Sequence, residues 1–486
     1  MTHENSSPCE MQICVLGFWE IPDFVRWPGY ACRALPGRKE ETALNTKAKP
    51  NAKSGSNATK CCIISAGEIF GDGAMMELVS GSSEPNKPDL LLWNGRKAIV
   101  APRVEHGGCI YEAPELPQSL YRATRFPSRC SDYGSARGLF AAIIDLFKRH
   151  LDLPQRESSL LSCFSISTWL ADRLPTAPTL TISGPDQELG IDVLRLLSCL
   201  CRHPLMLAEV TPGGFRSLPR QLSLSLLLNQ QELKPNMQRL LRASNYRGLH
   251  LPGNRGSVVD PYGPKAIFCG NDDAIDTLGG GVIHISAAPS QVQSSALDER
   301  VQNEIADDFQ PRLLMYRLKN FGKVRESPVD VSTFTFSTRQ LAHTLAACFP
   351  EDPELARDAV QLFRPQDEEV RGQRSSDVDC AIVEILWGTI HDRKQKAVRV
   401  DELAKFVNAL LRSRGETLDY NAEEVGWKLR GLNIPRHTSS SGRQVLLGRN
   451  TSQLVHRLVQ AYDLPCSQRV EAGCPDCNQE ERAISK

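Results

Sequence analysis

Two segments of the chain have the outline of a site for phosphate and magnesium. The first, residues 179–197, passes from an apolar stretch through Ser183-Gly184-Pro185-Asp186-Gln187-Glu188-Leu189-Gly190 into a helical pattern. A loop for nucleotide phosphates reads G-x-x-x-x-G-K-[S/T], because backbone N–H groups cradle the phosphates, Lys pairs with them and the hydroxyl helps to hold magnesium. Counted from Gly184, the second Gly falls on Leu189, the Lys on Gly190 and the hydroxyl on Ile191. The segment therefore lacks the cation of such a loop.

The second segment, residues 222–233, is an apolar run that ends in Asn229-Gln230. A hydrolase needs two acids there, one to orient the metal and one to prepare the attacking water. Amides supply neither negative charge nor a general base. We therefore expect no catalytic residue and no cofactor. Backbone N–H groups at a helix start can still bind an anion, although Asp186 and Glu188 oppose phosphate.

Both segments belong to a longer region in which apolar runs alternate with helical or loop stretches. Strands are expected at residues 179–183, 206–210, 222–228, 265–269 and 282–286. Such alternation favours a parallel α/β sheet with helices on both faces. In this frame Asn271 follows the fourth strand, and a glycine run at 279–281 precedes the fifth.

The rest of the chain divides by composition. We expect a largely flexible segment at 1–85 and a small antiparallel β unit at 86–130, in which Asn94-Gly95 predicts a hairpin. A helical lead-in and the degenerate sheet core follow at 131–295, then a helical lid-like region at 296–364 and a polar linker at 365–379. Residues 380–464 show three helices and a basic hairpin, the plan of a winged helix. Residues 465–486 are expected to be a disordered tail.

The combination of segments resembles P-loop ATPase domains of the primase-helicase and virulence-associated type found in mobile elements. The resemblance covers roughly residues 133–464 and is carried by TISGPDQELGID, LLLNQ, KAIFCGND and NAEEVGWKLRGLNIPR. It implies a P-loop NTPase-like (AAA+-like) fold in which a helical lead-in precedes the ATPase core and a winged-helix-like unit follows it. The small β unit that the sequence pattern predicts precedes this fold, and the predicted helical region lies between the sheet and the winged helix. The resemblance also implies a phosphate-sensing role for Asn271, whereas Gly279-Gly280-Gly281 stands where relatives often place an arginine finger.

Taken together, the resemblance gives a set of degenerate nucleotide-binding positions. They are Ser183, Gly184, Pro185, Asp186, Gln187, Glu188, Leu189, Gly190, Asn229, Gln230 and Asn271. Because Lys, hydroxyl, both acids and Arg are missing together, we expect a protein that does not hydrolyse nucleotide. Two alternatives stay open, an active ATPase that takes its cation from elsewhere and a structural scaffold.

The last unit carries a local surplus of positive charge. Residues 381–470 contain 14 Lys plus Arg and 9 Asp plus Glu, in a chain with 57 of each. Cations suit phosphate contacts, so the candidate DNA-binding residues are Lys428, Arg430, Arg436, His437, Arg443 and Arg449. The alternative is a winged helix that binds a protein partner, which Glu423 and Glu424 favour. Weaker candidates for a nucleic-acid path are Arg312, Arg317, Lys319, Lys323 and Arg325, and also Arg242, Arg247 and Arg255.

Composition sets the remaining expectations. The chain has 486 residues, zero formal net charge and 16 cysteines, several of them on apolar elements, which does not indicate a disulfide framework. Cys474 and Cys477 form a C-x-x-C pair, but no second pair or His spacing follows, so we expect no metal site. With no apolar run near the ~20 residues of a membrane span, a cytoplasmic protein without membrane contact is expected, and a homo-oligomer is possible.

Overall fold

The computed structural model describes residues 62–81, 84, 86–253, 258–270, 278, 281–287, 297–325, 329–440, 442–469 and 474–477. Asn271, Gly279 and Gly280, together with the first 61 residues, lie outside this set, so the expectations for them are not addressed. None of the described helices is both long and apolar enough to cross a membrane.

Two small sheets precede the main sheet. One has the strand order β2-β3-β4-β5 and is antiparallel, whereas the other, β1-β7-β6, pairs β1 with β7 in parallel. Their strands are β1 Cys62–Ile64, β2 Glu68–Ile69, β3 Met75–Val79, β4 Asp89–Trp93, β5 Ala98–Ala101, β6 Arg103–His106 and β7 Cys109–Glu112. β1, β2 and β3 precede residue 85, and β3 is fully buried. The ordered β region therefore begins before the expected boundary at residue 85. It also differs from the expected antiparallel unit, because β1 and β7 are parallel.

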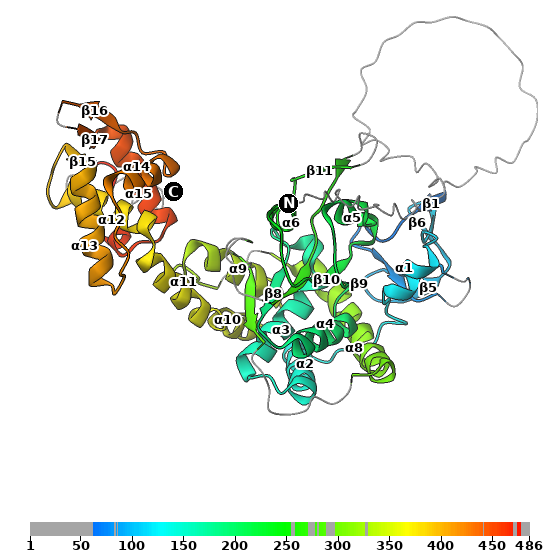
Figure 1. Ribbon diagram of the computed structural model, residues 1–486. Coiled ribbons are helices and arrows are strands. Elements are labelled where there is room, and N and C mark those ends of the chain that lie inside the picture. Colours follow the sequence, from blue (N-terminus) through cyan, green and yellow to red (C-terminus); the bar gives the residue numbers. More distant parts are fainter. Residues whose placement is uncertain are drawn as a thin grey trace, which may run out of the picture. The chain divides into compact units, whose positions relative to one another are not determined.

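The main sheet is five-stranded and entirely parallel. Its order is β14-β8-β13-β10-β9, so the fourth strand along the chain lies between the first and the third. The strands are β8 Thr179–Ser183, β9 Pro204–Leu207, β10 Ser225–Asn229, β13 Lys265–Cys269 and β14 Ile283–Ser286. Figure 1 places them at the centre of the α/β region. This parallel sheet with flanking helices confirms the expected α/β class and is consistent with a P-loop-like fold.

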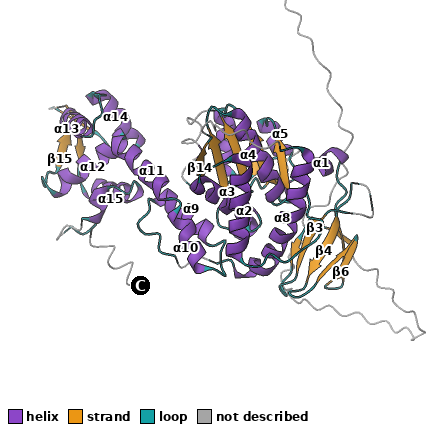
Figure 2. Ribbon diagram, turned by 90° about the horizontal axis from the view of Figure 1, so that it is seen from below, coloured by secondary structure: helices purple, strands orange, loops and turns teal. Residues whose placement is uncertain are grey.

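Alternate residues of the sheet face two different hydrophobic cores, as the pleat requires. Ala266 and Phe268 join the core formed with the helices α2 Ala136–Leu151, α3 Gln155–Thr168 and α4 Gln187–Leu200. Ile267 and Cys269 join the opposite core, which contains residues of α5 Pro212–Ser217, α6 Pro235–Ala243 and the small sheets. Figure 2 shows α2, α3 and α4 gathered beside the sheet. The remaining short elements of this region are α1 Gln118–Ala123, β11 Leu251–Pro252 and β12 Val258–Val259.

Three helices follow the sheet and complete the first core. They are α8 Glu299–Asn320, α9 Phe336–Ala346 and α10 Pro353–Gln361, and their apolar residues lie in the same cluster as those of α2, α3 and α4. They therefore pack as part of the main body, which differs from the expected lid-like region.

The segment expected to be a linker is a helix, α11 Arg364–Ser376. Its polar composition suggested a linker, but Asp367 is buried and accepts hydrogen bonds from the backbone N–H and hydroxyl of Thr335, at 2.8 and 2.7 Å. Side-chain contacts of this kind hold a polar helix in place where its apolar content would not.

The C-terminal unit has a hydrophobic core of its own. It consists of α12 Val378–His391, β15 Ala397–Arg399, α13 Val400–Ser413, α14 Ala422–Gly431, β16 His437–Ser439, β17 Gly442–Leu446 and α15 Arg449–Ala461. The three strands form an antiparallel sheet in the order β15-β17-β16. Asn421 begins α14 with a capping box completed by Glu424. After α15, Pro465–Gln468 forms a 3-10 helix and Cys466 is buried, so this part of the expected disordered tail is ordered.

Candidate functional site

The turn after β8 is shorter than a phosphate loop. Only Gly184, Pro185 and Asp186 separate the strand from α4, which begins at Gln187. Gly184 has φ 143°, and a methyl group added there would lie 2.3 Å from the carbonyl oxygen of Ala287. The backbone N–H of Ala287 donates to the Ser183 carbonyl at 2.6 Å. The chain after β14 thus closes against the turn where a loop would need space for phosphate.

Asp186 occupies the N-terminus of α4. Its carboxylate accepts a hydrogen bond from the backbone N–H of Leu189 at 2.9 Å. A helix N-terminus attracts anions because its first N–H groups lack partners and carry partial positive charge. Here the protein supplies its own anion, and Glu188 adds a second negative charge in the first turn. A nucleotide phosphate would have to displace one carboxylate and approach another.

Gly190 is buried in the first turns of α4 against the sheet. A methyl group at this position would lie 2.3 Å from the ring of Phe268 on β13. The position that aligns with the phosphate-loop Lys therefore has no space for a side chain. Of the sequence-predicted loop residues, Gln187 to Gly190 belong to the helix, and Leu189 and Gly190 face its buried side.

Ser183, the last residue of β8, is also buried. Its hydroxyl lies 2.8 Å from Nε2 of His284 on the edge strand β14. The backbone N–H of His284 lies 3.4 Å from Oε1 of Gln366 in α11. These contacts tie α11 to the edge of the sheet and give Ser183 a structural partner.

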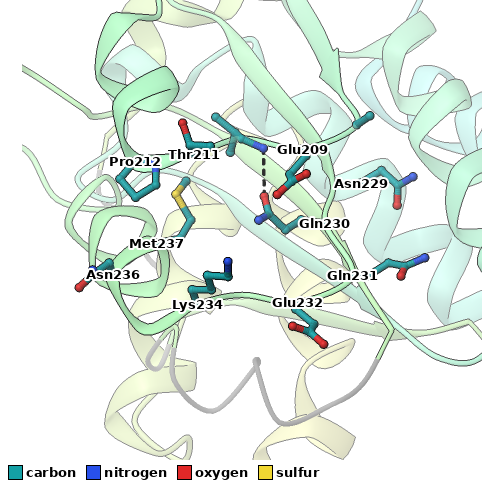
Figure 3. A pocket seen from close by; sticks show the side chains of 12 residues that line it. Glu209, Thr211, Pro212, Asn229, Gln230, Gln231, Glu232, Lys234, Asn236 and Met237 are labelled. Atoms are coloured by element: carbon teal, nitrogen blue, oxygen red, sulfur yellow. Dashed lines mark hydrogen bonds between the residues drawn. The ribbon is translucent and has the colours of Figure 1, made fainter. Parts of the chain in front are cut away.

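Asn229 and Gln230, the amides at the positions where metal-binding acids were expected, lie at the carboxyl end of β10. Gln230 is 8% exposed, and its side-chain oxygen accepts a hydrogen bond from the backbone N–H of Val210 at 3.2 Å (Figure 3). The backbone N–H of Gln230 donates to the Phe268 carbonyl at 3.0 Å. Oδ1 of Asn229 is buried and has no hydrogen-bond partner among the described residues. Gln230 therefore acts as a structural link between β10 and the loop after β9.

A hollow of about 620 Å³ opens beside these amides. Its charged lining consists of Glu209, Glu232 and Lys234, and amides and Met237 supply much of the rest (Figure 3). None of residues 183–190 lines it, because β13 lies between β10 and the strand that carries the Gly184 turn. The hollow is thus separate from the position expected for phosphate, and its lining carries two carboxylates for one ammonium group.

The candidate DNA-binding residues occupy different environments in the C-terminal unit. Lys428 of α14 is half-buried, with its ammonium 3.4 Å from a carboxylate oxygen of Asp379. Arg436 is also half-buried, and its guanidinium lies so close to α14 that a methyl group on Gly426 would be 2.6 Å from Nη1. Both side chains therefore already make contacts inside the C-terminal unit and are less accessible to DNA than exposed cations.

The other four candidates are exposed: Arg430, His437, Arg443 and Arg449. His437 pairs with Gln444 in the sheet, whereas Arg443 pairs with Thr438, so their side chains project from opposite faces. Among the described residues, Arg430, Arg443 and Arg449 make no ion pair. Three of the six predicted residues are thus exposed cations without an ion pair in the described part of the chain. The six do not all lie on one face.

Two sets of residues depart from the sequence-based expectation. Arg317, a weaker nucleic-acid candidate, is 1% exposed and forms ion pairs with Glu77 and Asp172 at 2.6 and 2.5 Å. Cys474 and Cys477, expected in a tail without metal ligands, lie beside His391 and His456. The two histidines come from helices far apart in the chain, so spacing in the sequence gave no signal for this cluster.

No family model matches the chain, and no curated protein matches it. The apo A form of the NrS-1 C-terminal region covers 77% of this chain and 97% of its own length, at 8% identity and a TM-score of 0.34. A second structure of that region covers 77% and 96%, at 10% identity and the same TM-score, 0.34. A chain from Drosophila ORC bound to DNA covers 71% and 96%, at 12% identity and a TM-score of 0.16. With scores this low, the fold assignment depends on the topology of the sheet itself.

Proposed function

We propose that this chain is a P-loop NTPase-like protein that does not hydrolyse nucleotide and that acts through its C-terminal unit. The observation that carries the proposal is the start of α4. Asp186 caps the helix with its own carboxylate, and Gly190 has no space for a Lys beside Phe268. A phosphoryl-transfer site depends on positioned cations and a bound magnesium ion. Neither the turn nor Asn229-Gln230 offers the charges for them.

A nucleotide titration tests this part. Purified full-length chain should bind ATP no more tightly with magnesium than without it, and should show no magnesium-dependent phosphate release above background. Asn229→Ala serves as the matched variant. Turnover that disappears in this variant would overturn the proposal, because it would make Asn229 part of a working site.

For the C-terminal unit we propose a winged helix that binds DNA. Three helices, α12, α13 and α14, precede the β16–β17 hairpin, and β15 completes the small sheet. In a winged helix the third helix and the hairpin contact DNA. Arg430 on α14 and Arg443 on β17 are exposed and without ion pairs in the described part of the chain, so they are the best-placed phosphate contacts.

The measurement is DNA affinity as a function of salt. Each phosphate contact adds roughly 0.9 to the slope of log affinity against log salt. Arg430→Glu combined with Arg443→Glu should weaken binding at least tenfold and flatten the slope. Arg399→Glu is the control, because Arg399 lies on the same small sheet but pairs with Asp401 at 2.9 Å. Unchanged affinity and slope in the double variant would rule out this role for α14 and the hairpin.

One observation favours a protein partner as the second candidate. Trp427 on α14 is 60% exposed, and Glu423, one helical turn earlier, is also exposed. An exposed Trp beside an acid suits a protein contact better than a phosphate backbone. If the contact is between copies of the chain, light scattering should show assembly that grows with concentration, and Trp427→Ala should abolish it while DNA affinity stays the same.

A further inference from the structure

Four side chains with metal-binding atoms converge in the C-terminal unit. They come from the end of α12, from α15 and from the segment after it: His391, His456, Cys474 and Cys477. One ligand atom of each lies within 4.8 Å of all the others. The two histidines are buried and the two cysteines half-buried. The group is thus a compact set of two imidazoles and two thiols from three separate parts of the unit.

Four of the six distances between the ligand atoms are close to those of a tetrahedral zinc site. Nε2 of His456 lies 3.0 Å from Nε2 of His391, 3.3 Å from Sγ of Cys477 and 3.5 Å from Sγ of Cys474. Sγ of Cys477 lies 3.8 Å from Nε2 of His391. Zinc bonds of about 2.0–2.1 Å to nitrogen and 2.3 Å to sulfur place neighbouring ligand atoms about 3.3–3.8 Å apart in a tetrahedron. A small inward or outward shift of each side chain completes that geometry.

A hydrogen bond holds the imidazole ring of His456 in an orientation suited to metal binding. Its Nδ1–H donates to the backbone carbonyl of Ser452 at 2.7 Å. This bond directs the lone pair of Nε2 toward the cluster, which is the arrangement that orients metal-bound imidazoles. The ring of His391 packs against Trp387 with centroids 4.4 Å apart, so it too has a fixed orientation.

The types and number of the ligands indicate which metal the cluster would bind and whether the site is structural or catalytic. Thiolate and imidazole favour zinc over magnesium or calcium, which take oxygen ligands. Four protein ligands leave no open position for water or substrate, which is typical of a structural site. In the segment Cys474-Pro-Asp-Cys477, Asp476 also accepts a hydrogen bond of 3.2 Å from the Ser452 hydroxyl, so this segment lies against α15.

We propose that His391, His456, Cys474 and Cys477 form a structural zinc site that fastens the segment after α15 to α12 and α15. Bound zinc supplies stability by joining these three parts, because it binds the folded arrangement and not the unfolded chain.

The first test is the metal content of the full-length chain, purified under reducing conditions and dialysed against metal-free buffer. We expect about one zinc ion per chain, and loss of it in Cys474→Ser combined with Cys477→Ser. The matched control is Cys62→Ser combined with Cys109→Ser, which removes two accessible thiols outside the cluster and should keep the zinc. Retention of zinc in the first double variant, or no zinc uptake by the reduced wild-type chain, would overturn the proposal.

A spectroscopic test remains valid if a variant folds poorly. Cobalt added to the chelator-treated wild-type chain should give the visible bands of tetrahedral cobalt and thiolate charge transfer, and equimolar zinc should remove them. His391→Ala should lose these bands, because it leaves three ligands. His391→Cys keeps four ligands and should retain them. If cobalt gives only octahedral bands, or if Cys474 and Cys477 form a disulfide in reducing buffer, the four residues are not a zinc site.

Discussion

At the scale of single residues, the contact between Gly190 and Phe268 decides whether a Lys side chain can be placed at position 190. A side chain at position 190 would meet the ring at 2.3 Å, and overpacking of this kind costs about 1–3 kcal/mol. We expect Gly190→Lys to lower the free energy of unfolding by that amount and to create no nucleotide binding. Denaturant unfolding and an ATP titration measure both effects.

Two control variants separate the Cβ clash from the added charge. Gly190→Ala should lose most of the same stability, because the first carbon of the side chain makes the clash. Glu188→Lys adds positive charge at an exposed position of the same helix turn and should cost less than about 1 kcal/mol. Nucleotide binding by Gly190→Lys would show that the turn opens more than this structure indicates.

Lys265 predicts a specific pH dependence of stability. Its ammonium nitrogen is buried at the amino end of β13, 2.6 Å from Oδ1 of Asn245 and 3.1 Å from the hydroxyl of Thr179. Burial, with a smaller contribution from Arg220, lowers the pKa of Lys265 to about 7. Between that value and the unfolded pKa of about 10.4, the unfolded chain holds a proton that the folded chain has lost. The contribution of Lys265 therefore becomes more favourable as pH rises.

Between pH 7 and pH 9 this contribution amounts to about 2 kcal/mol. Other groups titrate in the same range, so the measured quantity is the difference between the wild-type chain and Lys265→Met. Denaturant unfolding at several pH values should give a difference that grows by that amount toward pH 9. Parallel curves for the two proteins would mean that Lys265 stays charged in the folded state.

At the scale of elements, a buried ion cluster joins β3 to the main body. Glu77 on β3 pairs with Arg202, which follows α4, at 2.8 Å and with Arg317 on α8 at 2.6 Å. Burial acts to raise the pKa of Glu77, but the two guanidinium groups outweigh it and hold the pKa below its usual value. The carboxylate is therefore charged at neutral pH and fixes the small sheet to α8 and to the segment between α4 and β9.

Removing that charge should be costly. Glu77→Gln leaves two buried guanidinium groups without their shared partner, and breaking a buried pair typically costs about 3–5 kcal/mol. Glu304→Gln is the matched control, because its pair with Arg300 is exposed and should be worth less than about 1 kcal/mol. Thermal unfolding of both variants measures the contrast, and equal midpoints would refute the role of the cluster.

The sequence predicted the elements of the main sheet better than it predicted their contacts. β8 and β13 begin and end at the expected residues, because each is a short apolar run between turn residues. α11 and the ordered residues around Cys474 were missed, because polar side chains with distant partners hold them and periodicity does not reveal such partners. The same limit applies to Arg317, whose spacing suggests a basic surface while its partners, Glu77 and Asp172, lie far away in the chain.

Only part of the description of the nucleotide site could be predicted from the sequence. Missing charges at Gly190 and Asn229-Gln230 can be read directly from residue types. The early start of α4 cannot, because it depends on Asp186 capping the helix and on Gly190 packing against Phe268. Those contacts add a physical reason, beyond the missing charges, to expect no phosphate binding at the turn.

At the scale of the whole molecule, the hydrophobic residues form three clusters. Two of them lie on opposite faces of the main sheet, whereas the third contains only residues from Val378 onward. A unit with its own core can fold by itself. Asp377 caps α12 by accepting hydrogen bonds from the backbone N–H groups of Asp379 and Cys380, so a fragment of residues 377–486 keeps its first helix intact.

We therefore expect fragment 377–486 to unfold cooperatively when it is separated from the rest of the chain. It loses the hydrogen bonds from Arg374 to the Tyr462 carbonyl and from Arg414 to the Ser375 carbonyl, and the ion pair of Arg371 with Asp463. These partly exposed contacts are together worth about 2–3 kcal/mol. Circular dichroism should show a helical fragment with one thermal transition. In the full-length chain, calorimetry should show this transition at a slightly higher temperature, beside a separate one for the main body. A fragment without a cooperative transition, with zinc present, would mean that the C-terminal unit depends on the main body for its fold.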